Sequence, residues 1–184
     1  MRILCLGWGS LIWKPDDLPV KGEWQTDGPS LPIEFARQSG DGRLTLVVAQ
    51  GCRNVKVLWA ELDVLTIEDA KSSLADREGI KNHNIKYSIG YWTQDNQSRH
   101  SEASTIGDWA INGSVDGIVW TGLKAGFKNS RGSVPTLAAT LEYLRGLESE
   151  SSKLAEEYVH RTPHQITTQY RETYEQEFGW NPII

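Results

Sequence analysis

The chain opens on a short apolar segment that a glycine-rich turn interrupts. Ile3 to Leu6 are consecutive apolar residues, and Gly7-Trp8-Gly9-Ser10 follows at once. A short apolar run that ends at turn residues predicts a buried strand leading into a tight loop. Lys14-Pro15 then favours an extended backbone, so we expect no helix to begin directly after the loop.

Alternation of apolar and polar residues predicts that the first two-thirds of the chain are rich in strands. Ile33–Arg37 and Leu44–Val48 flank the turn signal Ser39–Gly42, which is typical of a β-hairpin. Two polar stretches, 16–32 and 94–102, show no period and are expected to be a long connection and an exposed turn. Further strands are expected at 55–62, 85–93 and 116–123.

One helix is expected between these strands. Thr66, with Asp69 three residues later, is a variant of the capping box, and Gly79 is placed to end the helix. Glu78 therefore lies at the helix C-terminus or in the loop after it. The helix dipole disfavours a carboxylate there and favours its protonated form.

The last quarter of the chain has helical spacing. Leucine and tyrosine residues recur every three or four positions between 135 and 178. Thr162-Pro163 predicts the start of the final helix, and Gly179 predicts its end. The expected fold class is α+β: a small curled mixed β-sheet or barrel with one inserted helix and C-terminal helices packed outside.

Length and charge narrow the class of protein. The chain has 184 residues and a formal net charge of −5. We expect a single domain over residues 1–184, with 133–184 as a C-terminal helical extension. Without a broad basic field, nucleic acid and anionic membranes are not expected partners, whereas small molecules or proteins are. The oligomeric state stays open.

Cysteine usage and the N-terminus bear on the compartment. Cys5 and Cys52 are the only cysteines, and both lie in apolar runs where a thiol behaves as a small buried hydrophobe. The N-terminal apolar run is too short for a signal peptide, and no segment approaches a membrane span of about 20 apolar residues. We therefore expect a cytoplasmic protein that does not enter membranes.

The glycine-rich loop is the first candidate for chemistry. Glycines at 7 and 9 allow backbone angles closed to other residues and leave the main chain accessible, so N–H groups beside Ser10 can bind a carboxylate or phosphate. The alternative is a turn that only reverses the chain. Ile12 replaces the third glycine of the dinucleotide-binding fingerprint, and the nucleophile-elbow pattern is absent.

Other polar residues carry weaker signals. Arg37 is a candidate partner for a bound carboxylate, and a strand arginine facing solvent is the alternative. His160 and His164 have the spacing of a helical metal pair, but Pro163 lies between them and a third ligand is missing. We therefore expect no metal site and no cofactor.

Two segments resemble a known family. Gly7-Trp8-Gly9-Ser10-Leu11-Ile12-Trp13-Lys14-Pro15 resembles the opening loop of the γ-glutamylcyclotransferase-like superfamily and is most similar to its ChaC-type glutathione-degrading group. Arg77-Glu78-Gly79-Ile80 resembles the segment that carries the catalytic glutamate in that superfamily. The chain departs from the pattern at Trp8, where the family usually has tyrosine, and in lacking a longer glycine-containing stretch after the glutamate.

The resemblance implies an enzyme. Such enzymes release pyroglutamate from a small γ-glutamyl compound, glutathione among them, when the substrate's α-amine attacks its own γ-carbonyl. Glu78 would be the general acid and base, and the substrate α-carboxylate would be held by Gly7, Trp8, Gly9, Ser10 and Leu11. The alternative is a non-catalytic member of the same fold that binds an anionic metabolite or a partner protein.

Overall fold

The computed structural model describes residues 1–183, which divide into two compact units. The first unit contains Met1–Gly7, Leu11–Leu31 and Lys56–Leu123. The second contains Trp8–Ser10, Pro32–Val55 and the chain from Lys124 onward. Each unit is therefore assembled from segments that are distant in the sequence. The predicted helical extension, residues 133–184, groups with 32–55 in the second unit, and the single-domain expectation stays a prediction.

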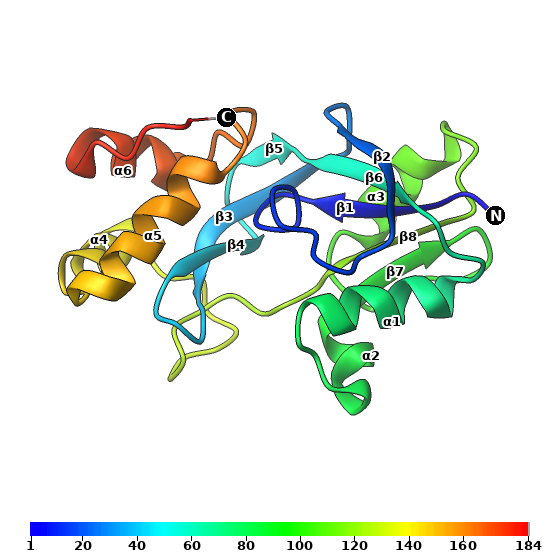
Figure 1. Cartoon of the computed structure of the whole chain (residues 1–184), viewed down its shortest axis with the longest axis horizontal. Coiled ribbons are helices and arrows are strands. Elements are labelled where there is room, and N and C mark those ends of the chain that lie inside the picture. The colour runs from blue at the N-terminus through cyan, green and yellow to red at the C-terminus, as the bar shows by residue number, and fades with distance from the viewer. Residues whose placement is uncertain (184) are drawn as a thin grey trace. The chain divides into compact units, whose positions relative to one another are not determined.

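A five-stranded mixed sheet forms the first unit (Figure 1). Its strand order is β2-β6-β1-β8-β7, in which β1 and β8 run parallel and the other neighbours are antiparallel. The central strand β1 is buried along its whole length, as the apolar run predicts. The strands are β1 (Ile3–Gly7), β2 (Val20–Gln25), β6 (Leu58–Leu62), β7 (Ile89–Thr93) and β8 (Gly117–Thr121).

Helix α1 (Ile67–Arg77) packs against one face of this sheet. Ile3 and Cys5 of β1 share a core with Leu74 and Ala75 of α1. Leu4 points to the opposite face, because successive side chains alternate along a strand. There it lines a small pocket with the paired rings of Trp59 and Trp109. The unit also contains the short helices η1 (Asn82–Asn84), α2 (Ile85–Ser88) and α3 (Ala103–Ile111).

The second unit combines strands with the three C-terminal helices. Its sheet has the order β4-β3-β5, and Phe35 of β3 packs edge-on against Tyr158 and Tyr174 at 6.1 and 5.7 Å between ring centroids. These contacts bring α5 and α6 against β3. The elements are β3 (Ser30–Gln38), β4 (Leu44–Val48), β5 (Asn54–Lys56), α4 (Leu137–Arg145), α5 (Ser149–Arg161) and α6 (Gln169–Phe178).

The predicted hairpin is confirmed, but three other segments differ from their prediction. β3 and β4 pair antiparallel around the predicted turn. The expected connection 16–32 contains β2, an edge strand whose largely exposed side chains leave no alternation to detect. The run 55–62 is two strands of different sheets, separated where the Val57 N–H bonds the Pro29 carbonyl. Only the second part of 85–93 is a strand, because 85–88 form α2.

The inserted helix 67–77 is confirmed, but it is not the only one. Helix α3 lies in a stretch that the sequence analysis left without structure, and it contains Gly107. A Cβ at Gly107 would lie 2.3 Å from Nε1 of Trp92, so the glycine is required by the close approach of this ring. The α+β class is confirmed, with two sheets in place of one and more than one inserted helix.

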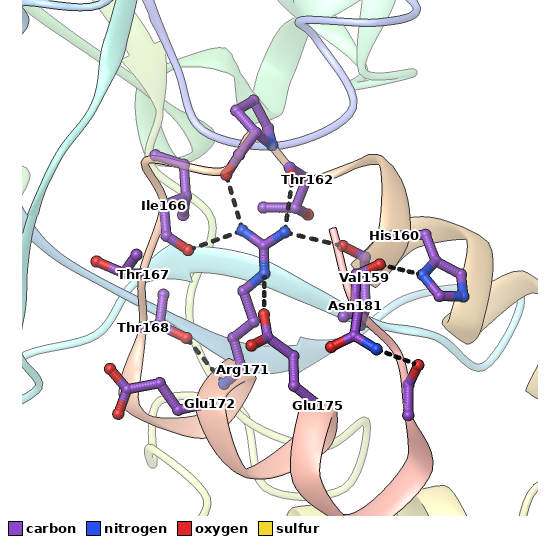
Figure 2. A network of polar contacts seen from close by, with 12 residues as sticks. Val159, His160, Thr162, Ile166, Thr167, Thr168, Arg171, Glu172, Glu175 and Asn181 are labelled. Atoms are coloured by element: carbon purple, nitrogen blue, oxygen red, sulfur yellow. Dashed lines mark hydrogen bonds and ion pairs between the residues drawn. The ribbon is translucent and has the colours of Figure 1, made fainter. Parts of the chain in front are cut away.

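The final helix begins at Gln169, six residues later than predicted, although Gly179 ends it as expected. Its N-cap is Thr168, whose side chain accepts a hydrogen bond from the N–H of Arg171. The guanidinium of Arg171, which is 2% exposed, is inserted into the turn between α5 and α6 (Figure 2). It donates to the carbonyls of Val159, Thr162, Pro163 and Ile166. These hydrogen bonds hold the segment between α5 and α6 as a turn, and α6 begins only after it.

The structure also bears on the predicted absence of membrane spans and on the two cysteines. Within residues 1–183 no helix has the length and apolar composition needed to cross a membrane. Cys5 is buried as predicted, whereas Cys52 lies half-buried in the turn after β4 rather than in a strand.

Candidate active site

Helix α1 carries the predicted catalytic glutamate at its C-terminal end. Its start is a complete capping box: the Thr66 hydroxyl accepts from the Asp69 N–H at 3.1 Å, and the Asp69 carboxylate accepts from the Thr66 N–H at 3.2 Å. Ala70 and Leu74 then anchor the helix in the core of the first unit. The position of Glu78 is therefore determined by a well-capped and buried helix.

The end of α1 is equally well defined. The Ile80 N–H donates to the Ala75 carbonyl at 2.8 Å, and the Gly79 N–H donates to the Asp76 carbonyl at 3.0 Å. This is a Schellman motif, which requires the left-handed backbone that Gly79 adopts at φ +65°. Glu78 is the C-cap residue, as the sequence predicts.

The Glu78 carboxylate is held through one oxygen. Nη1 of Arg77 donates to Oε1 at 2.5 Å, and the two side chains are 8% and 18% exposed. Within the described chain, no hydrogen bond to Oε2 is found. One oxygen is thus fixed in direction by Arg77.

Arg77 also binds the segment that follows the glycine-rich loop. Its Nη2 donates to the Lys14 carbonyl at 2.6 Å, and its Nε lies 4.0 Å from a carboxylate oxygen of Asp16. In the first unit the C-terminus of α1 therefore contacts Lys14 and Asp16, which follow the loop directly in the sequence.

Cys5, two residues before the loop, is an electrostatic neighbour of Glu78. Burial raises the pKa of the Cys5 thiol, the Glu78 carboxylate raises it further, and Arg77 lowers it. A thiol with a raised pKa stays protonated and is a poor nucleophile. In the first unit Glu78 is thus an electrostatic neighbour of Cys5, before the loop, and Arg77 beside it binds Lys14, after the loop. Cys5 does not supply a reactive thiolate.

The two loop glycines have a different role from the one expected. Neither Gly7 nor Gly9 adopts a left-handed backbone. A Cβ at Gly7 would lie 2.6 Å from the Trp24 ring in the first unit, and one at Gly9 would lie 2.2 Å from the Tyr158 hydroxyl in the second. The sequence-based reason, unusual backbone angles, is wrong, and close packing of aromatic side chains replaces it.

The large side chains of the loop are packed in the cores of the two units. Trp8 is buried in the second unit, where its indole N–H donates to the Leu46 carbonyl at 3.2 Å, and Leu11 belongs to the core of the first. Within residues 1–183, no hydrogen bond donated by the main-chain N–H of Trp8, Gly9 or Leu11 is found. Buried N–H groups normally have acceptors, so these are candidates for anion binding. Ser10 between them is half-buried.

Arg37 has a structural contact. At the end of β3 in the second unit, its Nη1 donates to the Lys124 carbonyl at 2.7 Å. This hydrogen bond links β3 to the segment where Arg37 also forms an isolated bridge with Gly126. Its predicted role in binding a substrate carboxylate stays a prediction.

Sequence reasoning did not assign a role to Arg77 or Tyr158. Arg77 appears in the sequence analysis only as part of the segment that carries Glu78, and its bond to Lys14 joins residues 63 positions apart. Tyr158 was expected only as a buried helix residue. Its hydroxyl accepts from the Leu46 N–H at 3.3 Å and reaches Gly9. Both contacts depend on tertiary structure, so no local sequence pattern predicts them.

Both ring nitrogens of His160 contact other groups of the protein. The His160 ring contacts the Asn181 carbonyl through Nδ1 and the Glu156 carboxylate through Nε2, at 3.4 Å for the latter. In the part of the chain that the structure describes, no three His, Cys, Asp or Glu residues are grouped as metal ligands.

Comparisons of this chain with models of known families, with curated protein sequences and with solved structures give no match. The site is therefore interpreted from its own residues and from the resemblance of its two motifs.

Proposed function

We propose that this chain is a γ-glutamyl cyclotransferase with a γ-glutamylcyclotransferase-like fold. The substrate's α-amine nitrogen attacks its γ-carbonyl carbon and forms the five-membered lactam of pyroglutamate. The bond from that carbon to the leaving nitrogen breaks, and the proton lost by the amine is delivered to the leaving nitrogen. Glu78 accepts the first proton and donates it in the second step.

The observation that carries this proposal is the state of the Glu78 carboxylate. One oxygen is fixed by Arg77 and the other has no partner within the described chain, on a side chain that is 18% exposed. A general base must be held in direction and still be able to reach the substrate. A solvated surface glutamate meets neither condition.

Besides a general acid and base, the reaction requires only that the protein bind the substrate in its reactive conformation. Because nucleophile and carbonyl belong to one molecule, holding the reactive conformer lowers the barrier by up to about 7–11 kcal/mol. No protein nucleophile is needed, in agreement with the buried, protonated Cys5. Binding of the α-carboxylate is assigned to the loop, whose Trp8, Gly9 and Leu11 N–H groups have no acceptor in residues 1–183. Two free cysteines are compatible with a cytoplasmic location.

A direct assay tests the proposal. The purified protein is incubated with γ-glutamyl dipeptides, γ-glutamyl amines and glutathione, and pyroglutamate is quantified by mass spectrometry. We expect release from at least one substrate, and Glu78→Gln should lose it by about 10²–10⁴-fold. Glu68→Gln is the matched control, because Glu68 lies at the exposed start of α1. Equal losses in both variants, or no release by the wild type, would contradict the proposal.

The loop also supports a second candidate, a non-catalytic protein that binds an anionic metabolite or an acidic group of a partner protein. Free main-chain N–H groups serve anion binding whether or not Glu78 transfers protons. Calorimetry with the same γ-glutamyl compounds separates the two functions. Binding without turnover, unaffected by Glu78→Gln, would favour this second function.

A further inference from the structure

The planar guanidinium of Arg77 contacts both Glu78 and Lys14. Nη1 donates to Oε1 of Glu78 and Nη2 donates to the Lys14 carbonyl, at 2.5 and 2.6 Å. A guanidinium presents its N–H groups in a rigid fork, so the directions of these two bonds are linked. The side chain is only 8% exposed, which limits alternative rotamers.

At the C-terminus of α1, the backbone is fixed and the conformational freedom that remains is that of the Glu78 side chain. The Schellman motif fixes the backbone of residues 78–80, and Ala75 is buried in the core. A glutamate side chain has three rotatable bonds, so a fixed backbone does not by itself orient the carboxylate. The contact that defines the direction of Oε1 is the one with Arg77.

We infer that Arg77 is a positioning residue of the proposed active site, which aligns the Glu78 carboxylate with the loop-following segment at Lys14. This inference rests on the proposed function. Arg77 transfers no proton itself; it holds the base in place and fixes its position relative to Lys14. Its loss should therefore lower the rate of the chemical step more than it weakens substrate binding.

Two substitutions and one control test this role. Arg77→Ala removes the fork and leaves space for an added cation, and Arg77→Lys keeps the charge but cannot reach both acceptors. Lys71→Ala is the matched control, because Lys71 is on the same helix and forms an ion pair with Glu68 at 2.9 Å. The readouts are kcat and KM for pyroglutamate release, with the thermal unfolding midpoint of each variant.

The expected result is a split between the two kinetic constants. A misplaced catalytic group costs about 10²-fold, so kcat of Arg77→Ala should fall by about that factor with KM little changed. Arg77→Lys should be intermediate, and Lys71→Ala should match the wild type. Guanidinium chloride, below concentrations that unfold the protein, should restore part of the kcat of Arg77→Ala but not that of Glu78→Gln. A purely structural role predicts the opposite, since a denaturant lowers the folded fraction further.

The outcomes separate the two hypotheses. A wild-type protein without cyclotransferase activity would contradict the proposed function, and the role of Arg77 would be rejected with it. An active wild type, with Arg77→Ala equal to Lys71→Ala in kcat or without rescue, would contradict the positioning role alone. If Arg77→Ala does not fold, wild-type kcat in Arg77→Lys would contradict it.

Discussion

A neighbouring side chain leaves no space for a Cβ at Gly9. A Cβ at this position would lie 2.2 Å from the Tyr158 hydroxyl, which is itself held by the Leu46 N–H. Gly9→Ala should therefore destabilise the protein by about 1–3 kcal/mol, the usual cost of overpacking. Urea unfolding measures the loss.

Tyr158→Phe provides the matched partner for this test. Removing the hydroxyl removes the clashing atom, so Gly9→Ala should cost less in the Tyr158→Phe background than in the wild type. Equal costs in both backgrounds would show that the close contact with Tyr158 is not the reason for a glycine at this position.

Glu34 is a buried carboxylate in the second unit, 0% exposed. It accepts hydrogen bonds from the N–H groups of Phe35 and Tyr170, the latter in the first turn of α6. Burial raises the pKa of Glu34 above its ordinary value of 4.5, and hydrogen bonds from Thr168 and nearby N–H groups only partly offset this.

A pH dependence of stability follows from that shift. Because the folded pKa is raised, the stabilisation linked to the protonated form is complete below pH 4.5 and is lost as the pH rises through the folded value. Glu34→Gln lacks this titration, so its stability deficit relative to the wild type should shrink between acidic and neutral pH. Urea unfolding of both proteins, with the exposed Glu157→Gln as control, measures it. A deficit that grows with pH would contradict the assignment.

At the scale of elements, the connection between α5 and α6 depends on one side chain. Arg171 satisfies four backbone carbonyls and forms an ion pair with Glu175 at 3.2 Å (Figure 2). Arg171→Met should cost about 3–5 kcal/mol, because it removes four hydrogen bonds that a buried guanidinium donates to backbone carbonyls.

Arg161→Met is the control for this prediction. Arg161 forms an exposed pair with Glu157 at 3.0 Å on α5, and such pairs contribute about 0–1 kcal/mol. Denaturant unfolding should therefore separate the two variants clearly. A similar loss in both would contradict the role of Arg171 in holding the α5–α6 turn.

Elements were predictable where their signals are local. The capping box at Thr66, the turn between β3 and β4 and the glycine at the end of α1 are each set by residues within a few positions. The late start of α6 was not predictable, because Thr162-Pro163 has the local features of a helix start. The guanidinium of Arg171, eight residues later, donates to the Pro163 carbonyl and holds this segment as a turn.

At the scale of the whole molecule, the candidate site combines predictable and unpredictable parts. Glu78 and the Gly7–Leu11 loop could be singled out because each is a short motif. The contact between Arg77 and Lys14 could not, since it joins residues 63 positions apart. Likewise the edge strand β2 carries few buried side chains, so its strand conformation depends on pairing with β6.

The most direct test of the account is the fate of water during turnover. The protein is incubated with a γ-glutamyl substrate in water enriched in ¹⁸O, and the products are analysed by mass spectrometry. Intramolecular attack by the α-amine predicts pyroglutamate without ¹⁸O, formed by the wild type and not by Glu78→Gln. Glutamate that carries ¹⁸O, or unlabelled pyroglutamate formed equally by both proteins, would contradict the claim that Glu78 drives cyclisation.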